Sequence, residues 1–313
     1  MSNQKKRRFT RLLVLLALLL LLAQLAAPAM AAEEVAESQR LPVLQLHQMV
    51  AGCADRYMLI LDDLVIMVDC GSNSVHRVVP DGLFNYMNAL GIDHVDYLFV
   101  THYHQDHAMH IDSLMETYGH ENSVVFGPSP ELPRRYLPLP NGHYKQLLDN
   151  QELDIGPLHI TCLGPEKPNM DGESNICSLN FLVEYGETCI FFTGDAVAAS
   201  IVQRHAEELS RVDILKFPHH GISLSNTTIP EAAVRLMPLK VVLFPGNNPS
   251  HIQNYLTRLG KPDARRYSNA SGNFVVLTDG VDIAVQTNIR PEDYGVPPDR
   301  LGHTLPADRI SAR

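Results

Sequence analysis

A run of potential metal ligands constrains this chain more than any other feature: His102, His104, Asp106 and His107 lie within six residues. The apolar segment Tyr97–Val100 just before them predicts a strand, so the run occupies a loop at a strand end. On such a loop His102 and His104 can point the same way, while Asp106 and His107 turn back towards a second ion about 3.5–4 Å away. The run therefore predicts a metal centre rather than a solvated histidine-rich loop.

Apolar segments alternate with turn signals on both sides of this loop. The pattern predicts strands paired by hairpins, interleaved with helices, and therefore two sheets packed face to face with helices outside, an α/β sandwich with αββα layers. The expected strands are Val43–Met49, Tyr57–Leu61, Leu64–Val68, Tyr97–Val100, Ser123–Phe126, Leu158–Leu163, Leu179–Glu184, Cys189–Thr193, Ile214–Phe217, Val241–Phe244, Asn273–Thr278 and Ile283–Thr287. The expected helices are Pro80–Leu90, Ile111–Tyr118, Ala196–Leu209, Ile229–Leu236 and Ile252–Leu259.

The N-terminus reads as a secretory signal peptide over residues 1–31. Basic residues at positions 5–8 and 11 precede the apolar run Leu12–Leu25, and Ala29-Met30-Ala31 supplies a cleavage motif. The alternative is a permanent membrane anchor, for which the run is rather short, since a span needs roughly 20 apolar residues. We expect a linker at 32–42, a catalytic domain at 43–289 and a flexible tail at 290–313, in a protein exported from a bacterial-type cell and without stable membrane insertion after cleavage.

The charge of the mature chain limits its partners. Cleavage removes five of the 25 Lys and Arg and none of the 35 Asp and Glu, which leaves a net charge of −15. Such a surface repels phosphate backbones and disfavours long nucleic acid without excluding it. Arg134-Arg135 and Arg265-Arg266 are the candidates for a local basic strip, and both pairs are expected on loops. The five cysteines are odd in number and contain no C-x-x-C pair, so no disulfide scaffold is expected.

Four motifs in order resemble the metallo-β-lactamase superfamily. The His102–His107 run matches its HxHxDH motif, and Val68-Asp69-Cys70-Gly71 looks like the segment whose aspartate braces the metal loop. Thr193-Gly194-Asp195 looks like the turn whose aspartate bridges both ions, and Leu215–Gly221 looks like the motif that supplies the last histidine. The resemblance covers about residues 43–287 and implies the metallo-β-lactamase fold.

Within the superfamily the chain is similar to the extracellular hydrolase domain of ComEC-type competence proteins and their secreted relatives. This likeness rests on Gly52-Cys53-Ala54-Asp55, the Asn175–Asn180 segment, Glu184-Tyr185-Gly186, His219-His220-Gly221 and Gly246-Asn247-Asn248. Bacterial phosphorylcholine esterases share much of the outline, which widens the range of substrates that the resemblance implies.

Three departures from the family pattern affect the site. Many members place a histidine about 20 residues before the bridging aspartate, where this chain has Asn175, so Asn175 or water is expected beside the first metal. His159 is expected to be structural, and His110 to cap the following helix rather than enter the pocket. Of His219 and His220 only one is expected to bind metal while the other contacts substrate, and His219 is the favoured ligand.

The resemblance implies a mechanism in which a metal-activated water attacks the substrate. One or two Zn²⁺ ions are expected, with Mn²⁺ possible, on His102, His104, Asp106, His107, Asp195 and one or both of His219 and His220. Asp106 is expected to orient the nucleophile, and His219 or His220 to contact a leaving oxygen. Asp69 is expected to support the ligands from behind. No serine offers a convincing nucleophile, and Ser223 and Ser225 are expected in a turn.

The expected function is a secreted metal-dependent phosphodiesterase acting on a small phosphodiester or a cell-surface substrate. The alternatives are hydrolysis of a β-lactam, lactone or thioester on the same fold, and a binding or regulatory module that retains only part of the metal site. The missing histidine at Asn175 makes β-lactamase activity the weaker of the enzymatic readings. The Pro-rich stretch Pro128–Pro140 is a candidate for gripping substrate.

Overall fold

The computed structural model describes residues 41–72, 81–170, 174–222, 224–225, 228–246, 249–268, 272–289 and 310–311. The chain divides into two compact units, Met1–Leu41 and Pro42–Arg313, and the second contains nearly all of the described residues. The expected signal peptide, most of the linker and most of the C-terminal tail lie outside the described residues. Among the residues that are described, no helix has the length and apolar character needed to cross a membrane.

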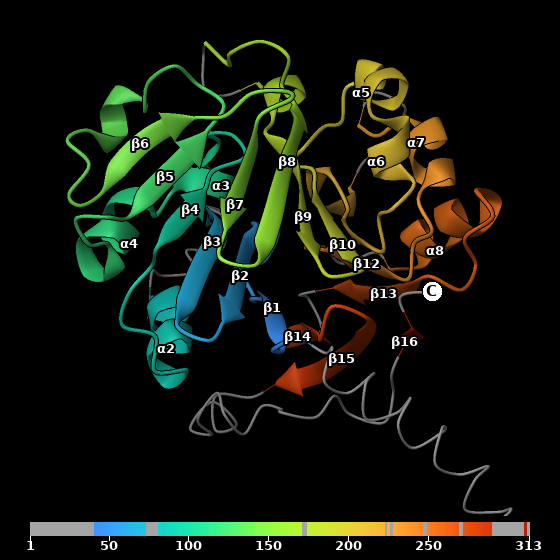
Figure 1. Cartoon of the computed structure of the whole chain (residues 1–313), viewed down its shortest axis with the longest axis horizontal. Coiled ribbons are helices and arrows are strands. Elements are labelled where there is room, and N and C mark those ends of the chain that lie inside the picture. The colour runs from blue at the N-terminus through green and yellow to red at the C-terminus, as the bar shows by residue number, and fades with distance from the viewer. Residues whose placement is uncertain are drawn as a thin grey trace, which may run out of the picture. The chain divides into compact units, whose positions relative to one another are not determined.

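The first sheet has nine strands in the order β16-β15-β14-β1-β2-β3-β4-β5-β6 (Figure 1). Following this order across the sheet, neighbouring strands are antiparallel from β16 as far as β3 and parallel from β3 to β6. The strands are β1 (Leu44–Gln48), β2 (Arg56–Leu61), β3 (Leu64–Cys70), β4 (Tyr97–Phe99), β5 (Val124–Gly127), β6 (His143–Gln146), β14 (Asn273–Thr278), β15 (Asp282–Ile289) and β16 (Ile310–Ser311).

The second sheet has seven strands in the order β13-β12-β11-β10-β9-β8-β7. Strands β7 to β10 are antiparallel, and β10 to β13 are parallel. They are β7 (Glu152–Ile155), β8 (Leu158–Gly164), β9 (Asn180–Tyr185), β10 (Thr188–Phe192), β11 (Ile214–Lys216), β12 (Val241–Phe244) and β13 (Arg265–Ser268).

Helices cover the outer face of each sheet. Figure 1 shows α2 (Asp81–Ala89) and α4 (Ile111–Tyr118) beside the first sheet, and the helices from α5 to α8 beside the second. The latter are α5 (Ala199–Arg204), α6 (Ala206–Leu209), α7 (Glu231–Leu236) and α8 (Pro249–Arg258). The short helix α3 (Gln105–Ala108) follows β4, and three 3-10 turns lie at Arg134–Tyr136, Asn175–Cys177 and His219–Gly221.

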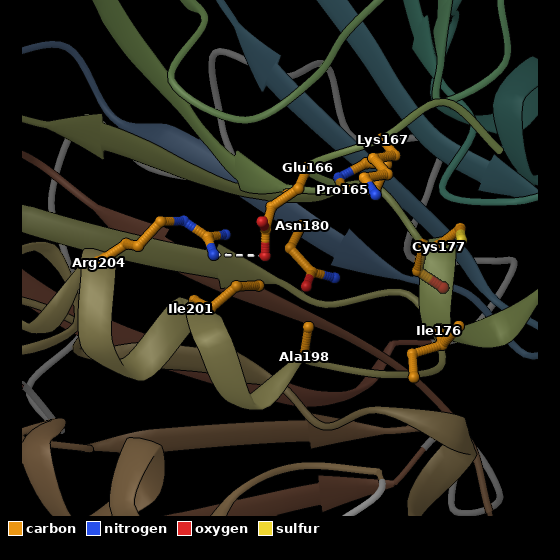
Figure 2. Close-up of a pocket in the computed structure, with 11 residues that line it drawn as sticks. Pro165, Glu166, Lys167, Ile176, Cys177, Asn180, Ala198, Ile201 and Arg204 are labelled. Atoms are coloured by element: carbon orange, nitrogen blue, oxygen red, sulfur yellow. Dashed lines mark hydrogen bonds and ion pairs between the residues drawn. The ribbon is translucent and has the colours of Figure 1, made fainter.

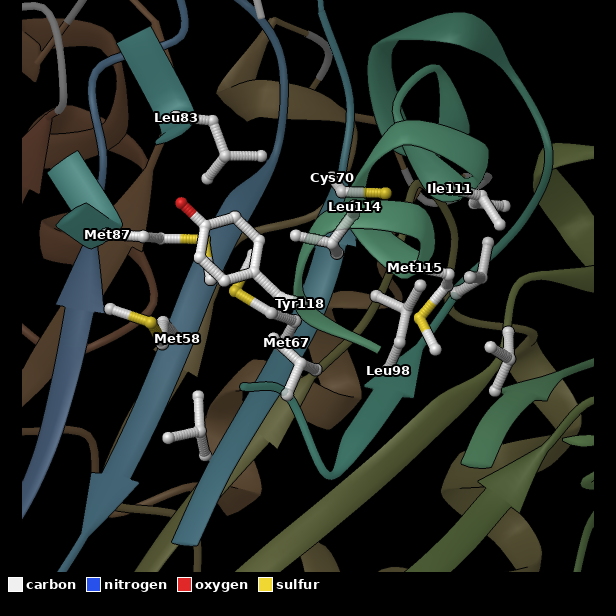
Figure 3. Packing of buried hydrophobic residues seen from close by; sticks show 14 of the residues in the cluster. Met58, Met67, Cys70, Leu83, Met87, Leu98, Ile111, Leu114, Met115 and Tyr118 are labelled. Carbon is white, nitrogen blue, oxygen red and sulfur yellow. The ribbon is translucent and has the colours of Figure 1, made fainter. Parts of the chain in front are cut away.

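The period-2 pattern of the strands places apolar side chains on both faces of the first sheet. Towards the helices, Met58, Met67 and Leu98 pack with Met87 of α2 and Met115 of α4, as Figure 3 shows. A second cluster joins the outer face of the other sheet to its helices, for example through Phe191, Leu215, Ala233 and Leu256.

The inner faces of the two sheets meet through aromatic side chains. The rings of Tyr57 in β2 and Phe192 in β10 lie 5.8 Å apart, and those of Phe99 in β4 and Phe181 in β9 lie 4.8 Å apart. Each ring pair joins one sheet to the other. The predicted αββα sandwich is therefore confirmed.

Several predicted elements differ from those observed. The helix expected at Ala196–Leu209 is two helices, α5 and α6, because His205 leaves helical geometry at φ −124° and ψ 36° and its Nε2 contacts Asp149 Oδ1 at 2.6 Å. The Arg265-Arg266 pair lies in strand β13 rather than on a loop. Strands β6, β7 and β16 were not predicted either, and β16, which lies in the segment expected to be a flexible tail, pairs with β15.

This topology brings four strand ends to one place. Parallel neighbours have their carboxyl ends at the same edge of a sheet, and ligands of α/β sheets bind at such edges. Asp69 lies near the end of β3, the HxHxDH loop follows β4, Asp195 follows β10, and His219-His220 follow β11. Motifs far apart in the sequence therefore meet where the two sheets face each other.

Candidate metal centre

The loop after β4 places two histidine nitrogens together. His102 is buried, and its Nε2 lies 3.0 Å from Nδ1 of His104. The same His102 nitrogen is 3.9 Å from Oδ2 of Asp195, which comes from the other sheet. Helix α3 begins directly after His104 and brings the His107 ring to 4.1 Å from the His102 ring.

Asp69 fixes the orientation of His107. One carboxylate oxygen accepts the Thr101 N–H at 2.7 Å, and the other accepts both the Thr101 hydroxyl and the His107 Nδ1–H, each at 2.7 Å. Asp69 has a left-handed backbone, φ 56°, and the next residue but one, Gly71, leaves no room for a side chain because an added Cβ would lie 1.8 Å from Asp106 O. The segment Asp69-Cys70-Gly71 therefore packs closely against the HxHxDH loop.

Asp195 stands at the centre of the cluster. Its Oδ1 is 3.0 Å from His107 Nε2, and its Oδ2 is 3.7 Å from His220 Nε2 and 3.9 Å from His219 Nε2. Gly194 before it has φ +56°, and a Cβ there would lie 2.6 Å from that of Ser178. The Thr-Gly-Asp sequence is therefore needed to turn Asp195 inwards from the end of β10.

The two adjacent histidines point in different directions. His219 and His220 both have left-handed backbones, φ 50° and 55°, which costs of order 1–3 kcal/mol per residue and is typical of functional sites. His220 is buried with Nε2 at 3.0 Å from Asp106 Oδ2, whereas the His219 side chain is 38% exposed. The geometry favours His220 as the ligand over His219, the residue favoured from the sequence; the ligand assignment itself stays a prediction.

Two further charged residues lie in the cluster and were not assigned a role from the sequence. Donor atoms of Asp55, His107, Asp195 and His220 all lie within 4.8 Å of one another. Lys216, fully buried at the end of β11, forms an ion pair with Asp55 and lies 3.9 Å from Asp195 Oδ1. A lysine inside the apolar strand Ile214–Phe217 was a visible signal, because such a charge needs a buried partner.

The carboxylates shift the protonation of the histidines around them. Burial opposes the charged form of His220 and His107, but contacts with neighbouring aspartates outweigh it and raise the pKa of His220 to about 9 and that of His107 well above its usual value. Burial, together with the nearby His107, lowers the pKa of His102 well below its usual value. His102 therefore keeps the neutral form that binds metals.

The residues present fit a divalent metal ion. His107 Nε2 and Asp195 Oδ1 are buried and 3.0 Å apart, and neither is assigned a hydrogen-bond partner among the described residues. Leaving buried polar atoms without a partner costs free energy. A bound cation would give both of these atoms a partner. Imidazole nitrogens and carboxylate oxygens are donors that Zn²⁺ accepts.

Comparison with known proteins identifies the family. The family model described as the metallo-beta-lactamase superfamily matches residues 56–243, which is more than half of the chain. The chain belongs to the metallo-beta-lactamase superfamily. Members of this superfamily are generally metal-dependent hydrolases. No curated protein matches the chain.

Solved structures share the superfamily fold at low sequence identity. The metallo-beta-lactamase fold protein YhfI from Bacillus subtilis aligns with a TM-score of 0.51 at 15% identity, covering 72% of this chain and 96% of that one. Yeast PDE1 aligns with a TM-score of 0.49 at 11% identity, covering 75% and 99%. Igni18, a metallo hydrolase of the archaeon Ignicoccus hospitalis, gives 0.47 at 13%, covering 72% and 95%. At these identities the likeness to YhfI shows the fold alone. The alignments with the other two structures are too weak to support a statement about fold or function.

Three further residues were weighed from the sequence as possible members of the site. Asn175 is connected to Asp195 through Ser178, which donates its hydroxyl to the Asn175 carbonyl at 2.7 Å and accepts the Asp195 N–H at 3.1 Å; Asn175 Oδ1 is buried and has no hydrogen-bond partner among the described residues. His159 pairs with Asp154 at 2.7 Å. His110 occupies the N-cap position of α4, as expected from the sequence, and its carbonyl accepts the Leu114 N–H at 2.8 Å, although its buried side chain makes no capping hydrogen bond.

Two cavities adjoin the segments that carry the cluster. One of about 440 Å³ begins at His220 and is lined by Cys53, Gly221, Ile222, Phe244, Gly246 and His251. The other, of about 290 Å³, lies against the 176–180 segment. Figure 2 shows Arg204 of α5 paired with Glu166 on one side of this cavity, with Ile176 and Cys177 on the other. The first is the cavity that contains a residue of the candidate centre.

Proposed function

We propose that this protein is a metal-dependent phosphodiesterase that uses water as its nucleophile. The observation that carries this proposal is the convergence of imidazole nitrogens and carboxylate oxygens at the carboxyl ends of β3, β4, β10 and β11, which brings together residues as distant in sequence as Asp106 and His220. Such a set of buried donors is costly to assemble without a cation to bind.

The donor atoms divide into two groups that share Asp195. His102, His104 and Asp195 Oδ2 would hold one ion, and Asp106, His107, His220 and Asp195 would hold a second. A divalent ion bound in this way polarises a phosphoryl oxygen and lowers the pKa of a coordinated water towards neutrality. Zn²⁺ suits these ligands, and Mn²⁺ is the second candidate because of the two aspartates.

The protein's own residues supply orientation and proton transfer. The Asp106 side chain is 35% exposed and therefore reaches the solvent side of the cluster, where it can accept a proton from an attacking water. His219 is 38% exposed beside Asp195 and can donate a hydrogen bond to a leaving oxygen. Asp69 keeps Nε2 of His107 free for metal by accepting the hydrogen on Nδ1.

Two features favour a phosphodiester over a β-lactam. The first group of donors has only two histidines, because Asn175 stands where many relatives have a third. Two divalent ions together with Lys216 would carry five positive charges against four carboxylates, the buried Asp55, Asp69 and Asp195 and the partly exposed Asp106. The remaining positive charge suits a phosphodiester, which bears one negative charge, better than a neutral amide.

The substrate is proposed to be small or part of a cell surface. One ester group of such a molecule fits the cavity of about 440 Å³ that begins at His220. The negative charge of the mature chain disfavours long nucleic acid. The motif resemblance to ComEC-type hydrolases and phosphorylcholine esterases supports the same choice.

Export from the cell is part of the proposal. It rests on the basic, apolar and Ala-x-Ala segments in residues 1–31, in the order of a signal peptide. Expression of the full chain in a bacterial host, followed by cell fractionation and N-terminal sequencing, tests it. A mature N-terminus near Ala32 outside the cytoplasm is expected, and full-length protein retained inside the cell would contradict export.

One experiment separates the candidate functions. Purified protein is stripped with a chelator and titrated with Zn²⁺ or Mn²⁺, and the ions per chain are measured by elemental analysis. Turnover is then followed on bis-p-nitrophenyl phosphate and on a chromogenic cephalosporin, with Asp195→Asn as the inactive control. Metal-dependent cleavage of the phosphodiester alone is expected. Cleavage of the cephalosporin alone would indicate carbonyl chemistry, and bound metal without either activity would indicate a binding module.

A further inference from the structure

Asp55 and Lys216 form a buried ion pair that connects the two sheets beneath the candidate centre. Asp55 directly precedes β2 in the first sheet, and Lys216 ends β11 in the second. Both side chains are almost completely buried, and their charged atoms are in contact. A buried ion pair is often no more stabilising than apolar residues of the same size, so fold stability alone is a weak explanation for it.

Lys216 holds the turn that carries Asp195. Its ammonium group donates to the Gly194 carbonyl at 2.7 Å and lies 3.9 Å from Asp195 Oδ1. Its own backbone carbonyl accepts the Thr193 hydroxyl at 2.8 Å. The side chain and the backbone of one residue therefore fix the Thr193–Asp195 turn from two sides.

Asp55 makes a backbone hydrogen bond to the HxHxDH loop, and its carboxylate lies on the Nδ1 side of His107 and His220. Its N–H donates to the Asp106 carbonyl at 2.9 Å, and its own carbonyl accepts the Gly71 N–H at 3.1 Å. Its carboxylate lies 3.6 Å from Nδ1 of His220 and 3.4 Å from Nδ1 of His107. The Nε2 atoms of the same two rings face Asp106 and Asp195 instead.

We propose that Asp55 and Lys216 are positioning residues, which hold His220 and Asp195 in place for the metal without binding it themselves. The spacing of donor atoms alone would admit Asp55 as a ligand. An imidazole, however, binds metal through one nitrogen and donates from the other, and Asp55 lies on the Nδ1 side. Its second oxygen is engaged by the Lys216 ammonium group. The inference rests on the metal centre of the proposed function.

The test compares two lysine–aspartate pairs at opposite ends of β11. Lys216→Met and Asp55→Asn each break the pair at the site, and the double variant removes both charges together. Lys240→Met is the matched control, because Lys240 pairs with the buried Asp213 at 2.8 Å just before β11. Circular dichroism and thermal melting report folding. Competition of apo-protein with a chromophoric chelator gives the affinity for Zn²⁺, and the visible spectrum of the Co²⁺ form reports ligand geometry.

The expected results differ between the two pairs. Lys216→Met, Asp55→Asn and the double variant weaken Zn²⁺ binding by about tenfold to a hundredfold and alter the Co²⁺ spectrum, as loss of outer partners typically does. Lys240→Met lowers the melting temperature but leaves affinity and spectrum unchanged. If a single variant does not fold, the double variant, which leaves no unpaired charge, provides the comparison.

Three outcomes would overturn the inference. Wild-type affinity in the double variant would make the pair a structural element only. Equal losses of affinity in Lys216→Met and Lys240→Met would do the same. A loss in Asp55→Asn with no effect of Lys216→Met, accompanied by one fewer ion per chain, would make Asp55 a ligand. Failure of the wild-type protein to bind any divalent ion refutes the proposed function instead.

Discussion

Replacing Asp69 by asparagine should separate metal binding from folding. The N–H of Thr101 needs an acceptor, so the amide oxygen of the introduced asparagine would take the place of Asp69 Oδ1 and its NH₂ group the place of Oδ2. That NH₂ group can donate to the Thr101 hydroxyl oxygen. It can donate to Nδ1 of His107 only if Nδ1 carries no hydrogen. His107 is then forced into the tautomer with hydrogen on Nε2. This hydrogen takes the place of the Nε2 lone pair that a metal needs, on the nitrogen that lies 3.0 Å from Asp195 Oδ1.

The contacts give the size of each effect. All of the polar atoms around residue 69 keep a partner in Asp69→Asn, so the free energy of unfolding should fall by only about 1 kcal/mol. Metal affinity should fall by about tenfold to a hundredfold, the usual cost of losing a carboxylate behind a ligating histidine. Asp69→Ala, by contrast, removes the carboxylate that accepts the buried Thr101 N–H and the His107 Nδ1–H, and should cost about 3–5 kcal/mol of stability.

The assay is a chelator competition with Zn²⁺, run beside urea denaturation of the metal-free protein. Thr101→Val is the control, because it removes one of the three hydrogen bonds to Asp69 and leaves His107 and its carboxylate in contact. It should lower stability by about 1 kcal/mol with little change in affinity. Wild-type affinity and turnover in Asp69→Asn would refute the tautomer argument.

The remaining predictions concern His219 and His220, Asp195, removal of the metal, and the buried His47 away from the site. His220→Ala should lose metal affinity, whereas His219→Ala should keep it and lower kcat; the reverse pattern in titration and kinetics would make His219 the ligand. Asp195→Ala should abolish both metal binding and turnover, and full turnover in that variant would contradict the shared-ligand arrangement. Removing the metal with a chelator should lower the melting temperature, because a ligand at 1,000 times its Kd adds about 4 kcal/mol to the stability of the folded state. Burial lowers the pKa of His47 to about 3, so the unfolded chain binds more protons below pH 6.5, and stability should fall by up to about 5 kcal/mol as pH drops from 6.5 towards 3. Urea denaturation of His47→Gln against pH checks this, and an unchanged acid loss would show that His47 is not its source.

The strands that the sequence did not predict are all at sheet edges. β16 and β6 are the two edges of one sheet, and β13 and β7 are the two edges of the other. β6 and β13 have largely polar, half-exposed sequences, His-Tyr-Lys-Gln and Arg-Arg-Tyr-Ser. Edge strands bury little apolar surface and are often charged, so they lack the alternation on which strand prediction depends. The central strands, whose apolar residues face both the helices and the other sheet, were predicted within one or two residues.

The candidate site could be predicted where its residues lie beside a strand end. The HxHxDH loop, Asp69 and Asp195 each stand beside a strand end that apolar patterning locates. The choice between His219 and His220 was not predictable, because both adopt left-handed backbones that only the surrounding structure imposes. One such constraint is the close approach of Gly246, where an added Cβ would lie 2.6 Å from the His220 carbonyl.

The roles of Asp55 and Lys216 required the tertiary structure for a different reason. Each belongs to a motif that was recognised, but a motif does not tell which of its members touch those of another motif. Asp55, Asp69, Asp106 and Asp195 are brought together by four separate segments, and their mutual repulsion opposes folding. The raised pKa values of His107 and His220 and the buried Lys216 are the protein's own compensation for this charge. A divalent ion would take over that compensation from the histidines and release their protons. The charge imbalance that opposes folding would therefore give the site its affinity for a cation.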